Sequence, residues 1–328
     1  MKLLTANHSS YPRIGSNTDE QALRRAIALR EQGRGTDDGV REAEDRLVKL
    51  ALEDQEKAGL DVVTDGLVRW NDPISHLSAK LDGIRIGGLI RYFDTNFYVR
   101  RAVAEGRPTR RRPLVLDEFK WAAERAARPV KAVLTGPCTF ARYSTSSGDG
   151  GNRGSLVLPY AEALAAEVAE LAAAGAHTIQ IDEPCLAKYP SDLALAREAI
   201  PLIASRKGDA ELGVAIFFGD VTPIYARLQE LPVDALILDF TYSKNLTRAI
   251  EAEGSAKRLG LGLIDGRNTK LDDKDSIARQ VERMSGRVTA DRCYLTTSCG
   301  LEFLPRDRAQ LKLKHLTAIK KLFLGESL

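Results

Sequence analysis

The sequence predicts an α/β fold, a single (β/α)8 TIM barrel, on three observations. Short apolar runs recur along the chain, helical patterns lie between them, and acidic residues stand where several runs end. In the second half these strand and helix patterns alternate at about thirty residues per unit, which is typical of βαβ units in a parallel sheet. A closed eight-stranded sheet with its helices accounts for 328 residues without a second core.

Eight apolar runs, most of them rich in β-branched residues, are the predicted barrel strands. Parallel strands that helices cover on both faces are expected to be almost continuously apolar. The predicted strands are 2–7, 61–64, 131–135, 178–181, 213–218, 235–238, 259–264 and 293–297.

Three segments between or after these runs show clear helical patterns. Residues 158–174 are rich in Ala, Leu and Glu and end before Gly175, a favourable residue at a helix C-terminus. Residues 275–284 and 309–323 carry apolar side chains at spacings of three and four, which predicts amphipathic helices.

Two stretches interrupt the alternation, and we expect both to be insertions at the mouth of a barrel that spans residues 1–328. Residues 15–59 carry two helical segments before the second strand, and residues 83–112 begin with a hairpin pattern over 83–103. The Gly/Ser-rich segment 145–155 is predicted to be a loop.

Composition narrows the class of protein. The net charge of +3 provides no general attraction for nucleic acid, and the basic run 107–112 is most simply a solvated loop. The four cysteines show no close pairing, the N-terminus lacks a signal-peptide pattern, and no apolar run reaches the ~18 residues of a membrane span. We therefore expect a cytoplasmic protein with a small-molecule substrate and neither a nucleic-acid nor a membrane partner; the sequence is compatible with a homodimer.

Reactive and acidic residues gather where the predicted strands end, which is where (β/α)8 barrels carry their chemistry. A buried carboxylate costs several kcal/mol unless it is paired or hydrogen-bonded, so a concentration of acids at one rim indicates a function. The alternative is that some of them cap the following helices. The strand-end residues are His8, Asp65, Gly136, Asp182, Glu183, Asp220, Asp239, Asp265 and Cys299.

Six segments, in order along the chain, resemble the catalytic domain of cobalamin-independent methionine synthases. The resemblance implies a barrel of the catalytic half only and transfer of a methyl group to a small thiol. The segments are 9–13 (SSYPR), 65–66 (DG), 134–139 (LTGPCT), 179–184 (IQIDEP), 264–268 (IDGRN) and 298–306 (SCGLEFLPR).

The chain departs from this family where the resemblance implies a zinc site. The family holds zinc through His-x-Cys at strand five, a carboxylate at strand six and Cys at strand eight. Here Ile216 and Phe218 stand where the His and Cys belong, or Ala215 and Phe217 if the alignment shifts by one residue, and neither pair can bind zinc. Asp239 and Cys299 match the other two ligand positions. We therefore expect no confident metal site: zinc would need a rebuilt ligand set, for which Cys138, Cys185 and His8 are candidates.

The resemblance also implies a changed substrate. The family has Asp-Gly-Glu after strand two, and its Glu receives the amino group of homocysteine, but here Leu67 follows Asp65 and Gly66. Tyr143 stands where the family usually has a Trp near the folate, and Ser9 replaces a glycine. Homocysteine should therefore be a poor substrate.

We expect methyl or alkyl transfer to a small thiol or related nucleophile. Two alternatives are a metal-free lyase or hydrolase in which Cys299 could be a nucleophile, and a barrel that binds a ligand without catalysis. Arg13 and Arg306 are candidate anchors for a carboxylate or phosphate, and the alternative for each is an ion pair at the surface. The candidate catalytic residues are Asp182, Glu183, Asp239 and Cys299, and the candidate substrate-binding residues are His8, Ser10, Arg13, Asp65, Thr139, Tyr143 and Phe218.

Overall fold

The computed structural model describes residues 2–146 and 153–326, and its main sheet has seven parallel strands. The order across the sheet is β1-β10-β9-β8-β7-β6-β4, so each strand from β6 to β10 lies beside the next one in the chain. The strands are β1 (Lys2–Thr5), β4 (Lys131–Thr135), β6 (Thr178–Asp182), β7 (Glu211–Ile216), β8 (Ala235–Asp239), β9 (Arg258–Ile264) and β10 (Arg292–Thr297).

The predicted second strand, 61–64, closes the ring between β1 and β4 but is shorter than expected. It forms two isolated parallel bridges, Ala6 with Val62 and Val63 with Val130. The Val62 amide donates to the Thr5 carbonyl at 3.1 Å, and the Lys131 amide donates to the Val63 carbonyl at 2.8 Å. Two residues thus connect the edge strands, and the barrel has seven regular strands and one reduced to bridges.

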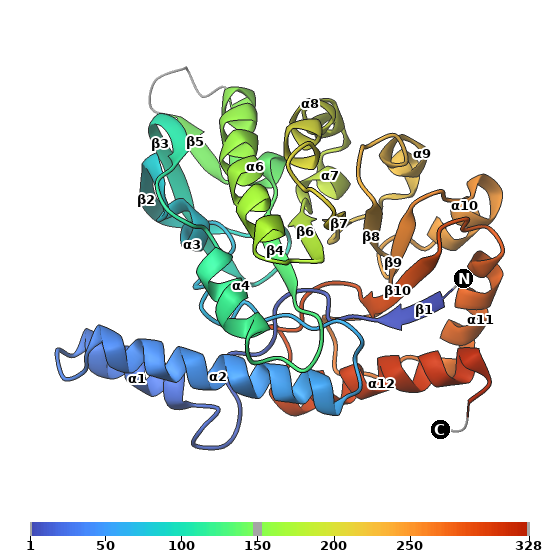
Figure 1. The fold of residues 1–328 in the computed structure, drawn as a ribbon, viewed down its shortest axis with the longest axis horizontal. Helices are drawn as coiled ribbons and strands as arrows, with labels where there is room; N and C mark the ends of the chain where they lie inside the picture. The colour runs from blue at the N-terminus through green and yellow to red at the C-terminus, as the bar shows by residue number, and fades with distance from the viewer. Residues whose placement is uncertain (1, 147–152, 327–328) are drawn as a thin grey trace.

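Helices surround the barrel (Figure 1). The three helices predicted from sequence are confirmed as α6, α11 and α12. The helices that follow or flank the barrel strands are α4 (Leu116–Ala123), α5 (Pro137–Arg142), α6 (Val157–Ala173), α7 (Cys185–Lys188), α8 (Leu193–Ala204), α9 (Tyr225–Leu228), α10 (Leu246–Glu253), α11 (Lys274–Ser285) and α12 (Arg306–Leu324). Short 3-10 turns lie at Arg153–Leu156, Pro190–Asp192 and Thr222–Ile224.

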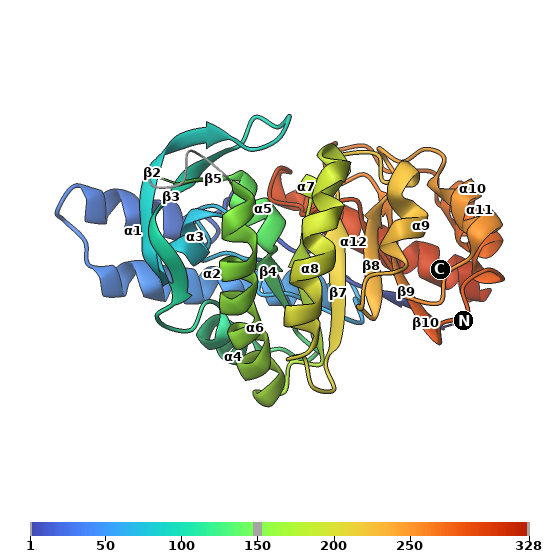
Figure 2. The same ribbon diagram turned by 90° about the horizontal axis from the view of Figure 1, so that it is seen from above.

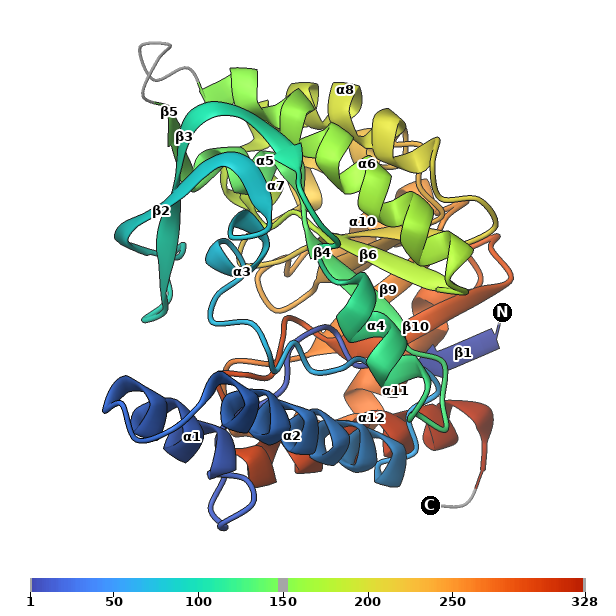
Figure 3. The same cartoon turned by 60° about the vertical axis from the view of Figure 1, so that its left-hand side comes forward.

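Two further units lie outside the barrel strands. Helices α1 (Ala22–Glu31) and α2 (Asp37–Lys57) form a hairpin that lies on the same side of the molecule as α12 (Figure 3). The antiparallel hairpin β2 (Leu81–Arg91) and β3 (Tyr98–Arg110) joins β5 (Ser144–Ser146) in a second sheet and arches beside α6 (Figure 2). The short helix α3 (Ser75–Ser78) precedes β2. Residues 147–152 of the predicted loop 145–155 lie outside the described residues.

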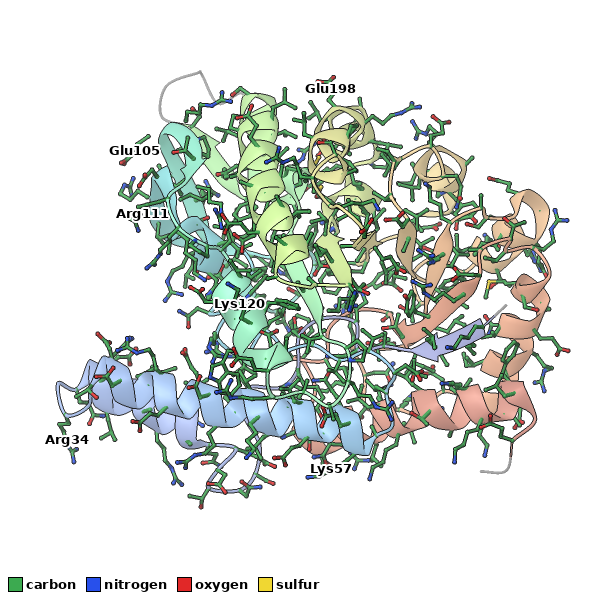
Figure 4. The ribbon with its side chains drawn as sticks, in the orientation of Figure 1. Arg34, Lys57, Glu105, Arg111, Lys120 and Glu198 are labelled. Atoms are coloured by element: carbon green, nitrogen blue, oxygen red, sulfur yellow. The ribbon has the colours of Figure 1, made fainter. Side chains whose placement is uncertain are left out.

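Charged side chains of both signs are spread over the outside of the molecule. The side chains labelled in Figure 4, which include Arg34, Lys120 and Glu198, are exposed and extend away from the ribbon. Within the described ranges, no helix combines the length and the apolar composition needed to cross a bilayer.

Candidate functional site

A cavity of about 740 Å³ opens at the carboxyl ends of the barrel strands. This volume is in the range of pockets that hold a small molecule. Its walls come from the segments after β1 and β10, from residues 66–73, from the ends of β6 and β7 and from the β2–β3 hairpin. Of the eleven residues predicted for catalysis or substrate binding, the cavity is lined by Ser10, Arg13, Asp182 and Phe218.

Asp182, the last residue of β6, faces the cavity and is backed by a buried polar chain. The Gln180 side-chain amide donates to Asp182 Oδ1 at 2.7 Å, and Lys131 Nζ donates to Gln180 Oε1 at 2.5 Å. Burial raises the pKa of Asp182 to about 7, against the opposing effect of the Gln180 hydrogen bond and the Lys131 charge. A carboxyl group that titrates near neutral pH can exchange protons with a bound substrate.

Glu302 is a second carboxylate in the cavity, and the sequence analysis did not give it a role. It follows β10, and it accepts a hydrogen bond from the Ser10 hydroxyl, which comes from the other side of the β1–β10 seam. Burial raises the pKa of Glu302 to about 7, and the nearby charge of Asp182 acts in the same direction. The motif at 298–306 contained this residue, but its sequence position did not show that it faces Asp182.

Glu183, although adjacent to Asp182, turns away from the cavity and ties β6 to α5. Its carboxylate accepts from the Cys138 and Thr139 amides, both at 2.8 Å, and from the Thr139 hydroxyl at 2.7 Å. A side chain on Gly136 would collide with Glu183, so this glycine permits the close approach. Glu183 and Thr139 are fully buried, and their geometry indicates a structural connection.

Asp239 does not line the cavity, but it accepts a hydrogen bond from the backbone of Phe218, which does. Its Oδ2 accepts from the Phe218 amide at 3.2 Å, and its Oδ1 accepts from the Thr241 amide and hydroxyl at 2.8 and 2.6 Å and from the Tyr242 amide at 3.2 Å. Strand β7 ends at Ile216, two residues earlier than predicted, because Phe218 adopts a φ of 67°. This left-handed conformation is costly for an aromatic residue, and Asp239 stabilises it.

Cys299 and His8 are fully enclosed and do not line the cavity. Burial raises the pKa of the Cys299 thiol well above its usual value, which disfavours the thiolate that a nucleophile requires. Burial and the Lys131 charge hold the pKa of His8 well below its usual value. The His8 carbonyl accepts hydrogen bonds from Lys131 and Gln180, so this residue supports the chain behind Asp182.

The remaining predicted residues lie behind the cavity wall. Asp65 accepts from the Leu67 amide at 3.0 Å, and burial raises its pKa to about 6. Leu67 itself lines the cavity, with a φ of 50°. The Tyr143 hydroxyl accepts from the Phe93 amide at 2.7 Å, and the Tyr143 ring packs against Tyr92.

Asp220 and Asp265 stabilise turns. Asp220 accepts from the Thr222 amide at 2.9 Å, and Asp265 accepts from the Arg267 amide at 2.7 Å. Each carboxylate thus binds the backbone two residues further on, a local role related to the capping alternative considered from the sequence.

Four aromatic rings in the cavity wall form a closed circuit that the sequence analysis missed, apart from Phe218. The ring centroids are 6.1 Å apart for Tyr92 and Phe97, 5.8 Å for Phe97 and Phe303, 6.2 Å for Phe303 and Phe218, and 6.4 Å for Phe218 and Tyr92. Neighbouring rings are inclined by 58° to 89°. All four residues line the same cavity as Asp182 and Glu302.

Comparison with known proteins agrees with this architecture. The sequence model described as "Cobalamin-independent synthase, Catalytic domain" matches residues 10–321. The chain belongs to this family. It is a methyltransferase-like enzyme, and the resemblance found in six sequence segments is confirmed over most of the chain.

Relatives and solved structures extend over nearly the same length. The methionine synthase of Thermococcus kodakarensis is 29% identical over 312 residues, which cover 92% of this chain and 90% of that protein. The methionine synthase of Saccharolobus islandicus is 30% identical over 302 residues, with coverage of 92% and 90%. The B12-independent methionine synthase of Shewanella sp. W3-18-1, solved with selenomethionine, has a TM-score of 0.80 at 19% identity and covers 99% of this chain and 98% of that one. This structural likeness shows the shared (β/α)8 fold.

At the positions where the resemblance implies zinc ligands, the side chains present do not fit a zinc ion. Ile216 and Phe218 have only hydrocarbon side chains, and both Asp239 oxygens already accept hydrogen bonds from the protein. Cys138 and Cys185 lie around Glu183 instead, where Cys185 Sγ is 3.4 Å from Glu183 Oε2. Among residues 2–146 and 153–326, no group of three or more His, Cys, Asp or Glu residues is placed to hold a metal. A catalytic zinc generally takes three protein ligands, which this arrangement does not supply.

Proposed function

We propose that this enzyme transfers a methyl or similar small alkyl group to a small thiol or related nucleophile other than homocysteine, without zinc. The observation that carries the proposal is the pair of cavity carboxylates, Asp182 and Glu302, set against apolar Leu67 and Phe218. Family membership supports methyl transfer, and the replaced side chains support a changed acceptor.

The carboxylates provide the proton chemistry that such a transfer needs. When a thiol or similar acceptor attacks a methyl carbon, it must lose its proton. The raised pKa of Asp182, about 7, matches a base that accepts this proton near neutral pH. Ser10 donates a hydrogen bond to Glu302 and Gln180 donates one to Asp182, so these side chains orient the two carboxylates. Lys131 in turn donates a hydrogen bond to Gln180.

At the position where the resemblance implies a Glu that receives the amino group of homocysteine, this chain has Leu67. An apolar Leu67 cannot hold an ammonium group, and a site built to pair a polar group loses orders of magnitude in efficiency when the pairing is absent. We therefore propose an acceptor without the homocysteine amino acid head.

The test is a methyl-transfer assay with carbon-13 methyl donors, which include methyltetrahydrofolate, methylcobalamin and trimethylsulfonium, against a panel of small thiols. We expect a methyl thioether from an acceptor other than homocysteine. Homocysteine methylation at an ordinary turnover of ~1–10 s⁻¹ would contradict the changed specificity, and transfer to no acceptor would contradict the reaction class. The Leu67→Glu variant should gain homocysteine methylation, with Leu67→Gln as the matched uncharged control.

A further inference from the structure

We propose that the cavity binds an alkylated onium ion, a sulfonium or quaternary ammonium group, inside the ring of Tyr92, Phe97, Phe218 and Phe303 and beside the carboxylates of Asp182 and Glu302. Its role as the methyl donor rests on the proposed function; its binding does not.

The dimensions of the aromatic ring suit such a cation. The four neighbouring centroid distances lie between 5.8 and 6.4 Å. For a square of that side, the centre is about 4 Å from each centroid, within the roughly 6 Å at which a cation is attracted to an aromatic face. Adjacent rings are strongly inclined and do not stack on one another, and all four residues line the cavity. A methylated onium ion cannot donate hydrogen bonds from its methyl groups, so aromatic walls suit it better than polar ones do.

The two carboxylates beside the ring also favour a cation. Asp182 and Glu302 both face the cavity, and among the described residues no lysine or arginine nitrogen lies within 4 Å of either carboxylate. Two arginines also line the cavity: Arg306 is paired with Asp54 at 2.7 Å, whereas Arg13 has no carboxylate within 4 Å among the described residues. Glu302 has the Ser10 hydroxyl as its side-chain partner, so its negative charge is not neutralised by the protein. A bound cation would supply the missing countercharge.

The ring is held in place from several separate elements. Tyr92 and Phe97 lie at the end of the β2–β3 hairpin, Phe218 follows β7, and Phe303 follows β10. Asp239 holds the Phe218 backbone, and the Thr95 hydroxyl donates to the Tyr92 carbonyl at 2.5 Å in the hairpin turn. The strained Phe218 conformation places an aromatic ring in the cavity at a position where the resemblance implies a metal-binding side chain. An onium donor also needs less activation of the acceptor, because its leaving group is neutral.

The donor role balances in atoms and charge. The acceptor sulfur or other nucleophile forms a bond to the methyl carbon while the carbon–sulfur or carbon–nitrogen bond of the onium ion breaks. The electron pair of that bond leaves with the neutral sulfide or tertiary amine. The proton of the acceptor passes to the Asp182 carboxylate, and no oxidant or reductant is involved.

Calorimetric titration of the full chain tests the binding. The probes are choline and trimethylsulfonium, and 3,3-dimethylbutan-1-ol is the uncharged control with the shape of choline. We expect saturable binding of at least one onium ion and an affinity at least about ten-fold lower for the neutral alcohol. Equal affinity for the alcohol and choline, or no saturation with either onium ion, would overturn the proposal. Choline alone would assign a quaternary ammonium group, and trimethylsulfonium alone would assign a sulfonium.

Variants connect the binding to the ring. Phe303→Leu should weaken onium binding about ten-fold, while Phe303→Tyr, which keeps a ring, should retain it. Phe323→Leu on α12 is the matched control, because Phe323 is partly buried but outside the cavity, and its affinity should be unchanged. Phe218 is less suitable, because Arg267 also lies over its ring at 5.3 Å. Unchanged onium affinity in Phe303→Leu would overturn the proposal that the four aromatic residues bind the onium ion.

The two proposals fail differently. Methyl transfer from a donor that is not an onium ion, without onium binding, would overturn this inference and leave the proposed function standing. Onium binding without methyl transfer to any acceptor would overturn the proposed function. The ring of four aromatic residues would then remain a binding site for an onium ion.

Discussion

At the scale of single residues, Asp182 and Glu302 are the groups most able to couple the cavity to pH. Both have a pKa raised to about 7, in each case mainly by burial. Because the folded-state pKa lies above the unfolded value, the folded protein binds more protons, and the empty enzyme loses stability as pH rises from about 4 through about 7. The ionised pair is therefore held in the folded state at a cost that a bound cation can offset.

We predict that onium affinity rises several-fold between pH 6 and pH 8, because the two carboxyl groups lose their protons over that range. Calorimetric titration with choline at both pH values measures the change. The neutral 3,3-dimethylbutan-1-ol provides the control and should bind equally at both. An onium affinity that does not vary with pH would contradict a role for these carboxylates.

Asp239 acts through Phe218, as a positioning residue. Asp239→Ala would leave the Phe218, Thr241 and Tyr242 amides without their acceptor. The buried Phe218 amide, left unsatisfied, costs about 1–3 kcal/mol. We predict lower stability in urea together with weaker choline binding, although Asp239 does not line the cavity. Asp239→Asn keeps one acceptor oxygen and should recover part of both properties. A loss of stability with unchanged choline affinity would show that Asp239 does not position the ring.

At the scale of elements, a polar cluster of Glu118, His76, Lys80 and Trp70 connects α4 to the segment around α3 behind the cavity wall. Glu118 of α4 accepts from His76 and Lys80 at 2.7 Å and from the Trp70 indole at 3.2 Å, and Trp70 lines the cavity. The His76 and Lys80 partners outweigh the opposing effect of burial and lower the pKa of Glu118 to about 2. The polar cluster around Glu118 therefore holds in place the segment that carries Leu67 and Trp70.

We predict that Glu118→Gln lowers the free energy of unfolding by roughly 3 kcal/mol at pH 7, because it leaves the partly buried Lys80 ammonium without a charged partner. The Glu118 contribution is fully present above the unfolded pKa of 4.5 and is lost as pH falls towards about 2. The difference between the wild type and the variant should thus narrow from pH 7 to pH 3 in urea unfolding. Exposed Glu124, at the end of the same helix, supplies the control Glu124→Gln, for which we expect a change within about 0.5 kcal/mol. An equal difference at pH 7 and pH 3 would argue against the ion cluster.

At the scale of the whole molecule, the barrel brings the ends of β7, β8 and β10 to one rim. The positions where the resemblance implies zinc ligands therefore lie at the same end of the barrel. We predict that purified protein carries less than stoichiometric zinc, because Ile216 and Phe218 are apolar and Asp239 is engaged in hydrogen bonds. Elemental analysis measures the zinc content. One equivalent of zinc that disappears in Cys299→Ser would refute this prediction and restore a thiolate ligand.

The sequence alone determined the parts of the fold that depend on local pattern. Apolar runs identified the seven regular barrel strands, and the spacing of apolar residues identified α6, α11 and α12. The segments at 9–13, 179–184 and 298–306 identified the family, because their residue types recur in a fixed order at strand ends. The first two segments located Ser10, Arg13 and Asp182 at the rim of the cavity, and the end of the predicted strand 213–218 located Phe218.

Only the tertiary structure decided which strand-end residues face a ligand. Successive residues at the end of β6 point in opposite directions, so Asp182 enters the cavity while Glu183 binds the start of α5. Phe218 enters it through a left-handed turn that no residue pattern indicates. Tyr92, Phe97 and Phe303 reach the same cavity from a hairpin and from the last strand, more than 200 residues apart. A ring of aromatic residues from such distant segments forms only when the barrel closes. Local sequence therefore cannot predict that these residues meet.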